Sequence, residues 1–413
     1  MKLFSRTPKP PLNVELSDKN KKLRVILLCI TITVAIVAFS IGISSLLSIE
    51  KGWHEIEVNS SDIHCGEDFV FNYYFDDKGT PTSEYRNVCG LYSKLATDAY
   101  WMFSAENNSD GRYNPAYINS HINETVKVDS ALYEAFELFS ENSSRALYLG
   151  PIYSVYDDLC FSEDEVFAKM KDPTRNSDVA EYFADLICFI QDPSHIELTL
   201  LGENQVLLTV SDEYLAFAEE NGIDVFLDLG WMKNAFIIDY MASALKQNGY
   251  TNGYISSYDG FTRNLDVSGK GYSLNIIDRL ENSAYPAAVL NYSGETAIVF
   301  LRNYPLSQKD VLYYYSWSDG VITTHYIDPS DGYSKSSTDN MVAYGSGVGC
   351  AEILLRMCPV YIADSFDESA ARAMTSCGIY AIWFEGTKLY TSGDSTMLKS
   401  LYKDENIEYI LAE

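Results

Sequence analysis

The feature that most constrains this chain is an apolar stretch near its N-terminus. Residues 25–49 read VILLCITITVAIVAFSIGISSLLSI and contain no charged residue. A helix needs about 20 such residues to cross the hydrocarbon core of a bilayer. The stretch is longer than the apolar region of a cleavable signal peptide, and cleavage near Ser44-Ser45 is the alternative. We therefore expect a transmembrane helix at 25–49, with the lipid bilayer as its partner.

The charge on the two sides of this stretch predicts its orientation. Residues 1–24 contain seven Lys or Arg and two acidic residues, a net charge of +5, whereas the whole chain carries −28. Basic flanks stay in the cytoplasm. We expect a single-pass protein of the cell membrane, with a cytoplasmic N-terminus and an acidic domain outside the cytoplasm. The acidic charge argues against nucleic acid as a partner.

The remaining chain is long enough for a substantial hydrophobic core. No internal repeat and no low-complexity linker divides it. We expect one compact unit, and the organisation has four parts: a basic tail at 1–24, the span at 25–49, a juxtamembrane segment at 50–69 and one extracytoplasmic domain at 70–413.

Hydrophobic periodicity predicts helices first and mostly strands afterwards. Apolar residues at helical spacing predict three helices, at 86–104, 131–142 and 177–190. Asp129-Ser130 has the chemistry of an N-cap for the second one. Later segments predict a hairpin at 196–210, a strand at 223–230, a helix at 231–249 and strands at 252–260, 272–277, 287–292 and 296–303. Helices that precede a strand-rich middle indicate the α+β class.

Seven cysteines lie outside the apolar stretch, and their spacing completes no zinc pattern. Disulfides are permitted outside the cytoplasm, so these residues are either core thiols or form one to three bridges. The sequence has no P-loop, no G-x-S-x-G and no H-E-x-x-H motif.

Three side chains are candidates for chemistry. His325 lies in TTHYIDPSDG, a segment whose Asp-Pro and Ser-Asp-Gly also favour a rigid turn. Asp228 ends a predicted buried strand, where functional carboxylates often stand. Asp239 follows on the next helix, and a lone Asp there can equally be a cap or an ion-pair partner.

The order of several segments resembles that of the ApbE family, the flavin transferases that attach FMN from FAD to a Thr or Ser of another protein. Phe103-Ser104, Asn119, the segment 126–134 and Gly150-Pro151 follow the order of the family. DLGWMKNAFIID (228–239) resembles the family's D-L-G-G-I-A-K-G-x-x-x-D, and HYIDPSDG (325–332) resembles H-I-I-D-P-x-T-G. The resemblance covers roughly residues 70–400 and implies an ApbE-like, T-fold-related mixed domain.

The resemblance also implies substrates and site residues. FAD would be the substrate, Mg²⁺ the metal, and a flavin-accepting membrane redox subunit the partner. Seven site residues follow from it: the cofactor-binding Asp228, Gly230, Asn234 and Asp239, the catalytic His325 and Asp328, and Glu352 as a substitute metal ligand.

The chain differs from the motifs of the family at two single positions and in two short segments. Trp231 stands at the second Gly of D-L-G-G and Asn234 at the following Lys, while SSRA (143–146) replaces G-A-F-D. CAEILL (350–355) replaces A-D-A-L-A-T, whose Asp and Thr bind Mg²⁺, an ion that prefers oxygen ligands. Two other functions therefore stay open: a catalytically degenerate binding or assembly module at the cell surface, and a domain that binds sugar or peptide through its tyrosines.

Overall fold

The computed structural model describes residues 21–47, 49–58, 68–76, 81–108, 112–281, 283–307, 309–310 and 313–412. In α1 (Lys21–Leu47), side chains are described at 22 and 25–40. The predicted cytoplasmic tail up to residue 20 and the juxtamembrane Cys65 lie outside the described residues.

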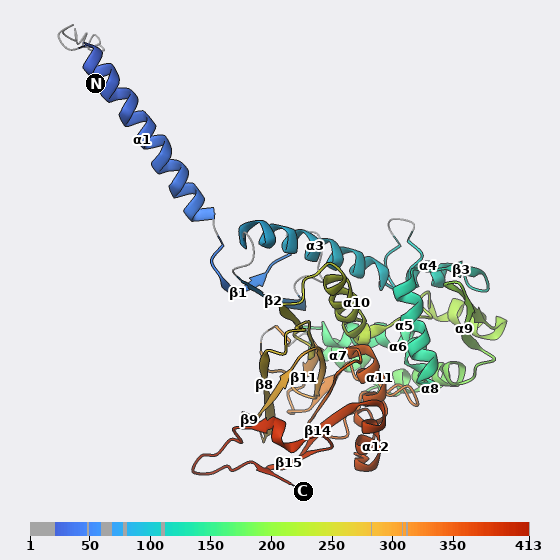
Figure 1. Ribbon diagram of the computed structural model, residues 1–413. Coiled ribbons are helices and arrows are strands. Elements are labelled where there is room, and N and C mark those ends of the chain that lie inside the picture. Colours follow the sequence, from blue (N-terminus) through green and yellow to red (C-terminus); the bar gives the residue numbers. More distant parts are fainter. Residues whose placement is uncertain are drawn as a thin grey trace, which may run out of the picture.

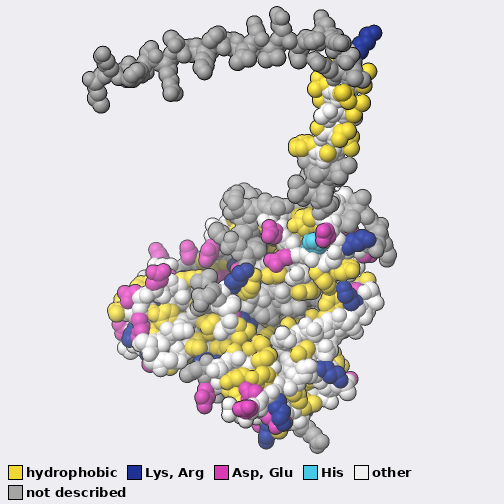
Figure 2. All heavy atoms as spheres, turned by 90° about the vertical axis from the view of Figure 1, so that its left-hand side faces the viewer, with side chains coloured by type: hydrophobic (Ala, Val, Ile, Leu, Met, Phe, Trp, Pro, Cys, Tyr) yellow, Lys and Arg dark blue, Asp and Glu magenta, His cyan; other side chains and the backbone are white. Residues whose placement is uncertain are grey.

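Helix α1 extends away from the rest of the chain (Figure 1). The large hydrophobic side chains from Val25 to Phe39 have exposed fractions between 50% and 71%. Figure 2 shows these hydrophobic side chains as a yellow column above the globular body. Within the described residues, no helix combines the length and the hydrophobicity needed to cross a bilayer. The transmembrane span at 25–49 stays a prediction.

A nine-stranded sheet organises the globular part, with the strand order β1-β2-β6-β7-β10-β13-β14-β15-β17. Its strands pair antiparallel except for β15 and β17, which are parallel. The strands are β1 (Gly52–Ile56), β2 (Phe69–Phe75), β6 (Gly253–Ser257), β7 (Phe261–Asn264), β10 (Thr296–Arg302), β13 (Asn340–Gly345), β14 (Ile379–Glu385), β15 (Lys388–Thr391) and β17 (Ile410–Leu411).

Both faces of this sheet are covered, and alternate residues of β10 show it. Ala297, Val299 and Leu301 belong to the larger core, which includes residues of α3 (Pro81–Met102), α10 (Lys233–Gln247) and α11 (Cys350–Tyr361). Ile298 and Phe300 belong to a second core on the opposite face. That core is closed by a small sheet of β8 (Gly271–Leu280), β9 (Ser283–Ser293) and β16 (Leu398–Lys399). Successive side chains of a strand point to opposite faces, which explains the alternation.

The chain between β2 and β6 forms a helical region beside the sheet (Figure 1). The helices after α3 are α4 (Pro115–Ser120), α5 (Ser130–Glu141), α6 (Gly150–Cys160), α7 (Glu165–Lys171), α8 (Ser177–Gln191) and α9 (Asp212–Asn221). A small sheet of β3 (Thr125–Lys127), β5 (Gln205–Val210) and β4 (Ile196–Gly202) packs with them. Two further elements lie later in the chain, the hairpin β11 (Tyr314–Ser316) and β12 (Ile322–Thr324), and α12 (Glu368–Ala373).

The prediction of a strand at 223–230 is wrong. Residues 223–229 adopt no regular secondary structure, and residue 230 begins a short 3₁₀ turn. The amide of Asn119 takes the place of a neighbouring strand: its Nδ2 donates to Leu227 O, and its Oδ1 accepts from the N–H groups of Phe226 and Leu227. One buried side chain therefore satisfies backbone groups that a sheet would otherwise pair.

The described cysteines are all free thiols: Cys29, Cys89, Cys160, Cys188, Cys350, Cys358 and Cys377. Of those outside the apolar stretch, Cys89, Cys160 and Cys350 are buried, as expected of core thiols, whereas Cys188 is exposed and Cys358 and Cys377 are partly buried. The mixed α+β class predicted from the order of helices and strands is confirmed.

Candidate functional site

A cavity of about 420 Å³ lies where five distant parts of the chain meet. Its walls come from residues 142–146, from Trp231 and Met232, from 327–330, from α11 with the residues that follow it, and from Gln191 at the end of α8. The segments 142–146, 231–232 and 327–330 include residues that match or replace those of the ApbE-like motifs. On α11 and just after it, the lining residues are Leu355, Cys358, Pro359, Ile362 and Ala363.

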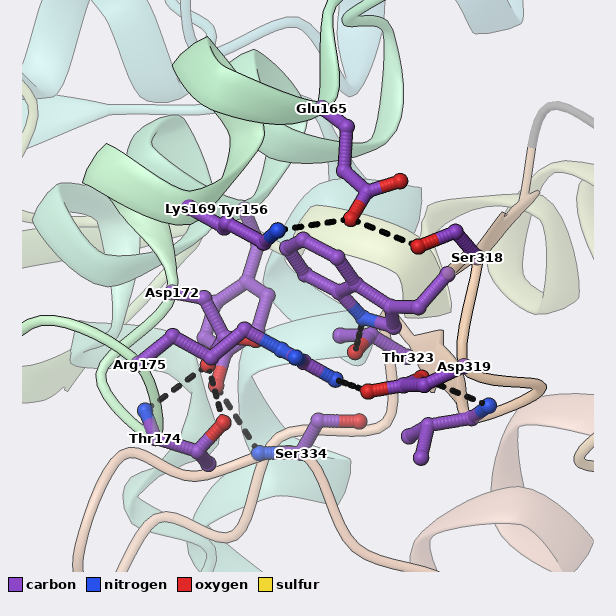
Figure 3. Close-up of polar contacts among 12 residues, drawn as sticks. Tyr156, Glu165, Lys169, Asp172, Thr174, Arg175, Ser318, Asp319, Thr323 and Ser334 are labelled. Carbon is purple, nitrogen blue, oxygen red and sulfur yellow. Dashed lines mark hydrogen bonds and ion pairs between the residues drawn. The ribbon is translucent and has the colours of Figure 1, made fainter.

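Side chains of α7 and of the residues that follow it contact the β11–β12 hairpin (Figure 3). The hairpin precedes residues 325–332, part of which lines the cavity. Arg175 donates to Asp319 at 2.9 Å and lies 3.3 Å from a carboxylate oxygen of Asp172. The hydroxyl of Ser318 donates to Glu165 at 2.9 Å. The links of Arg175 to Asp319 and of Ser318 to Glu165 join residues more than 140 positions apart, and they fix the hairpin before the chain enters 325–332.

His325 lies against α6 and is buried. Its Nε2 is 3.1 Å from Oδ1 of Asp157, and the next turn is held by Ser334, whose N–H donates to the Tyr156 hydroxyl at 2.9 Å. Burial by itself would lower the pKa of His325, but the neighbouring Cys160 and Asp157 side chains raise it to about 10. The ring is therefore an imidazolium at neutral pH, held in place by an acidic partner.

Asp328 borders the cavity, and its carboxylate already has partners. Oδ1 accepts from the N–H of Ser330 at 2.8 Å, and Oδ2 lies 2.9 Å from Nζ of Lys335. Burial opposes ionisation, but these two donors hold the pKa of Asp328 below its usual value. Lys335 also contacts Asp331 at 2.7 Å and Asp364 at 3.0 Å. Three carboxylates thus share one ammonium.

Asp228 and Gly230 form a tight turn immediately before Trp231. Oδ1 of Asp228 accepts from the N–H of Gly230 at 2.9 Å, and burial raises the pKa of Asp228 although Lys233 lowers it. Gly230 has a φ of +54°, and a Cβ there would come within 2.5 Å of the Tyr153 ring. Only glycine fits this turn, which directs Trp231 toward the cavity.

Asn234 and Asp239 face other parts of the protein. The Asn234 amide donates to Asp259 at 2.9 Å, and burial raises the pKa of Asp259 to about 6. Asp239 accepts from the N–H groups of Cys350 and Ala351, at 3.0 and 2.9 Å, and so caps the N-terminus of α11. Burial raises the pKa of Asp239, while its neighbour Arg263, 3.2 Å away, lowers it.

A Mg²⁺ ion does not fit these residues. Within the described residues, no three His, Cys, Asp or Glu side chains come together in a way that could hold a metal. Glu352 lies 3.4 Å from Nε of Arg356, and α11 offers the aliphatic Leu355 to the cavity. Mg²⁺ requires several oxygen ligands in near-octahedral geometry, and this donor set does not supply them.

The structure therefore brings together only part of the predicted site. Asp328 lines the cavity, and Asp228 and Gly230 shape the turn that carries Trp231 to it. Glu352 pairs with Arg356 on α11. His325 contacts α6, Asn234 contacts Asp259, and Asp239 caps α11.

Sequence reasoning missed Asp157 and Arg145, whose partners are remote in the chain. Lys335, only seven residues after Asp328, was within reach of a local search for counter-ions.

Comparison with known proteins identifies the fold. The ApbE protein of Thermotoga maritima superposes with a TM-score of 0.57 at 14% identity, covering 80% of this chain and 94% of that one. The flavin transferase ApbE of Vibrio cholerae gives 0.52 at 13% identity, covering 81% and 94%. No protein-family model and no curated protein sequence matches the chain. The ApbE-like architecture expected from the ordered motifs is thus confirmed by geometry where sequence identity is low. The chain has the fold of the ApbE flavin transferases.

Proposed function

We propose that this protein is a flavin transferase of the ApbE type, which takes FAD as its substrate and transfers FMN to a Thr or Ser of a membrane redox subunit. One observation carries the proposal: segments 142–146, 231–232 and 327–330 stand at the places of family motifs in the same order, with substitutions in the first two, and they converge on a single cavity of about 420 Å³. Cavities of this size are typical of small-molecule sites.

The proposal also includes a cellular location and a membrane topology. The domain at 70–413 would lie outside the cytoplasm, held by a single span at 25–49, and the acceptor would be a neighbouring membrane protein. The exposed apolar side chains of α1, from Val25 to Phe39, support this arrangement.

The lack of metal ligands among the described residues of the site favours a second function. Transfer of FMN from FAD to a hydroxyl breaks the bond to the leaving AMP, and this step depends on stabilising the charge that develops on the phosphate oxygens. The described residues offer no cluster that could hold a cation, and Glu352 is paired with Arg356. The second candidate is therefore a catalytically degenerate module that keeps the cavity for binding or assembly.

One experiment separates the two candidates. The full chain, purified in detergent, is titrated with FAD in the presence of MgCl₂ or EDTA while flavin fluorescence is followed, and AMP release is then measured. Saturable binding followed by AMP release supports the transferase. Saturable binding without AMP release supports the module. Absence of flavin binding would contradict the transferase and would support a module that does not bind flavin.

A further inference from the structure

The cavity described above carries little usable charge. Among the described residues that line it, Arg145 is the only cation and Asp328 the only anion. Phosphate groups are normally bound by free Arg or Lys side chains or by backbone N–H groups. Arg145 is therefore the one lining side chain among the described residues that could neutralise a phosphate in this cavity.

Arg145 is not free. Its Nε and Nη2 donate to Ile190 O at 2.9 and 2.6 Å, Nη2 also donates to Ile196 O at 2.7 Å, and Nη1 contacts Glu197. The guanidinium also lies 4.2 Å from the centroid of the Tyr148 ring. Ile190 and Ile196 are fully buried, so a turn of the side chain toward a ligand would leave their carbonyl oxygens unpaired.

The part of the cavity around Asp328 is electronegative. Lys335 is shared by Asp328, Asp331 and Asp364, so two negative charges remain in excess at this corner. Asp364 is 86% exposed and follows Ala363, which lines the cavity. A phosphate placed nearby would be repelled, most strongly at low ionic strength.

The rest of the lining suits an uncharged aromatic ring with one polar edge. Trp231 is half-buried, and its ring meets Tyr326 edge-on with centroids 4.8 Å apart. Leu355 and Ile362 add aliphatic surface, and neutral hydroxyl and amide groups stand at 142–144 and 330. An isoalloxazine ring combines an apolar face with a carbonyl-bearing edge and matches both parts.

We infer that this cavity binds a flavin through its uncharged isoalloxazine ring, without a divalent cation, so that riboflavin binds at least as tightly as FAD. The inference rests on the proposed function to the extent that the ligand is a flavin. It goes further in two respects. It states that riboflavin, which has no phosphate, binds at least as tightly as FAD, and it states that flavin binding needs no divalent cation.

The test compares three flavins on the full chain in detergent. Riboflavin, FMN and FAD are titrated separately by fluorescence quenching, each with MgCl₂ and with EDTA, at low and at high salt. We expect saturable riboflavin binding that is the same with MgCl₂ and EDTA. FMN should bind more weakly than riboflavin at low salt, and the difference should shrink at high salt because the repulsion is screened.

Substitutions at Trp231 and at Asp364 test the aromatic and the electrostatic contributions to binding. Trp231→Ala should weaken riboflavin binding about tenfold, equivalent to about 1.4 kcal/mol, and Trp231→Phe should retain most of it. Trp53→Ala, which changes an exposed indole on β1, is the matched control and should leave binding unchanged. Asp364→Asn should strengthen FMN binding several-fold at low salt without changing riboflavin binding, because only the phosphate senses the lost charge.

The outcomes distinguish this inference from the proposed function. FAD binding that requires MgCl₂, with riboflavin bound much more weakly, would overturn the inference and leave the transferase in place. Failure of all three flavins to bind would overturn both. If Asp364→Asn changed riboflavin and FMN binding equally, the electrostatic half of the inference would be wrong.

Discussion

Nε2 of His325 lies 3.1 Å from Oδ1 of Asp157, and this contact joins the segment after β12 to α6. On the other side of the ring, Nδ1 lies 3.2 Å from the carbonyl oxygen of Tyr313. Both nitrogens face oxygen atoms, so an imidazolium satisfies both contacts at once. The histidine of the H-x-I-D-P segment therefore stabilises the approach to the cavity and brings Asp328 to its edge.

The first prediction concerns the pH dependence of this contact. The pKa of His325 rises from 6.5 to about 10 on folding, so its stabilising contribution is complete below pH 6.5 and is lost as the pH rises through about 10. We expect Asp157→Asn to lower the free energy of unfolding by about 1 kcal/mol near pH 6, since Asp157 is half exposed. Urea unfolding across this pH range measures the difference, which should vanish above pH 10.

The neighbouring Asp158 provides the control. It is 53% exposed and pairs with Lys171 at 2.7 Å. Asp158→Asn should have a small effect that is similar at every pH between 6 and 10, because no group with a shifted pKa depends on it. A loss for Asp157→Asn that stayed constant over the same range would contradict the imidazolium assignment.

The second prediction concerns the cap of α11. Asp239→Ala removes an acceptor from two backbone N–H groups and leaves Arg263, whose side chain is 13% exposed, without its carboxylate partner. We expect a loss of about 3 kcal/mol in the free energy of unfolding. Glu352→Gln, which alters one partly exposed pair with Arg356, should cost less than about 0.5 kcal/mol. Equal losses for the two variants in denaturant unfolding would show that the cap is misassigned.

The third prediction concerns the turn before Trp231. Gly230→Ala adds a Cβ within 2.5 Å of the Tyr153 ring at a φ of +54°, so we expect a loss of about 2 kcal/mol or more. Gly90→Ala is the opposite case, because Gly90 is exposed in the interior of α3 and a Cβ there meets nothing within 4 Å. That variant should gain about 0.5–1 kcal/mol. Thermal unfolding of both variants checks the signs.

The fourth prediction concerns the lysine that the resemblance places at position 234. A lysine there would meet Asp259, which has one carboxylate oxygen buried without a hydrogen-bond partner. We expect Asn234→Lys to fold and to restore little AMP release from FAD, because no metal-binding cluster is present among the described residues. Asn234→Gln serves as a control for side-chain size. Large recovery of AMP release by the lysine variant alone would show that the metal ligands are not the main defect.

Local sequence signals predicted individual elements well. Asp129 accepts from the N–H of Ala131 and caps α5 as its position suggested. The hairpin of β4 and β5 turns at Glu203 and Asn204, both with positive φ. Capping and turn formation depend on residues two or three positions apart, so the sequence contains all the information they need.

The prediction from sequence was wrong where the hydrogen-bonding partner lies far away in the chain. Residues 223–229 have the composition of a buried strand, but two of them, Phe226 and Leu227, pair with the amide of Asn119, more than 100 positions earlier. The local sequence shows only that the backbone groups of this segment will be buried and need hydrogen-bond partners. It does not show whether those partners come from a neighbouring strand or from a single side chain.

The amino-acid sequence alone predicted the apolar stretch at 25–49, most of the helices and strands, and the ordered motifs that identify an ApbE-like fold. The roles of the site residues depend on the three-dimensional arrangement of their partners. A carboxylate can bind a metal, cap a helix or pair with a cation, and the group within hydrogen-bonding distance selects among these roles. For Asp239 that group is the N-terminus of α11, and for Asp328 it is Lys335.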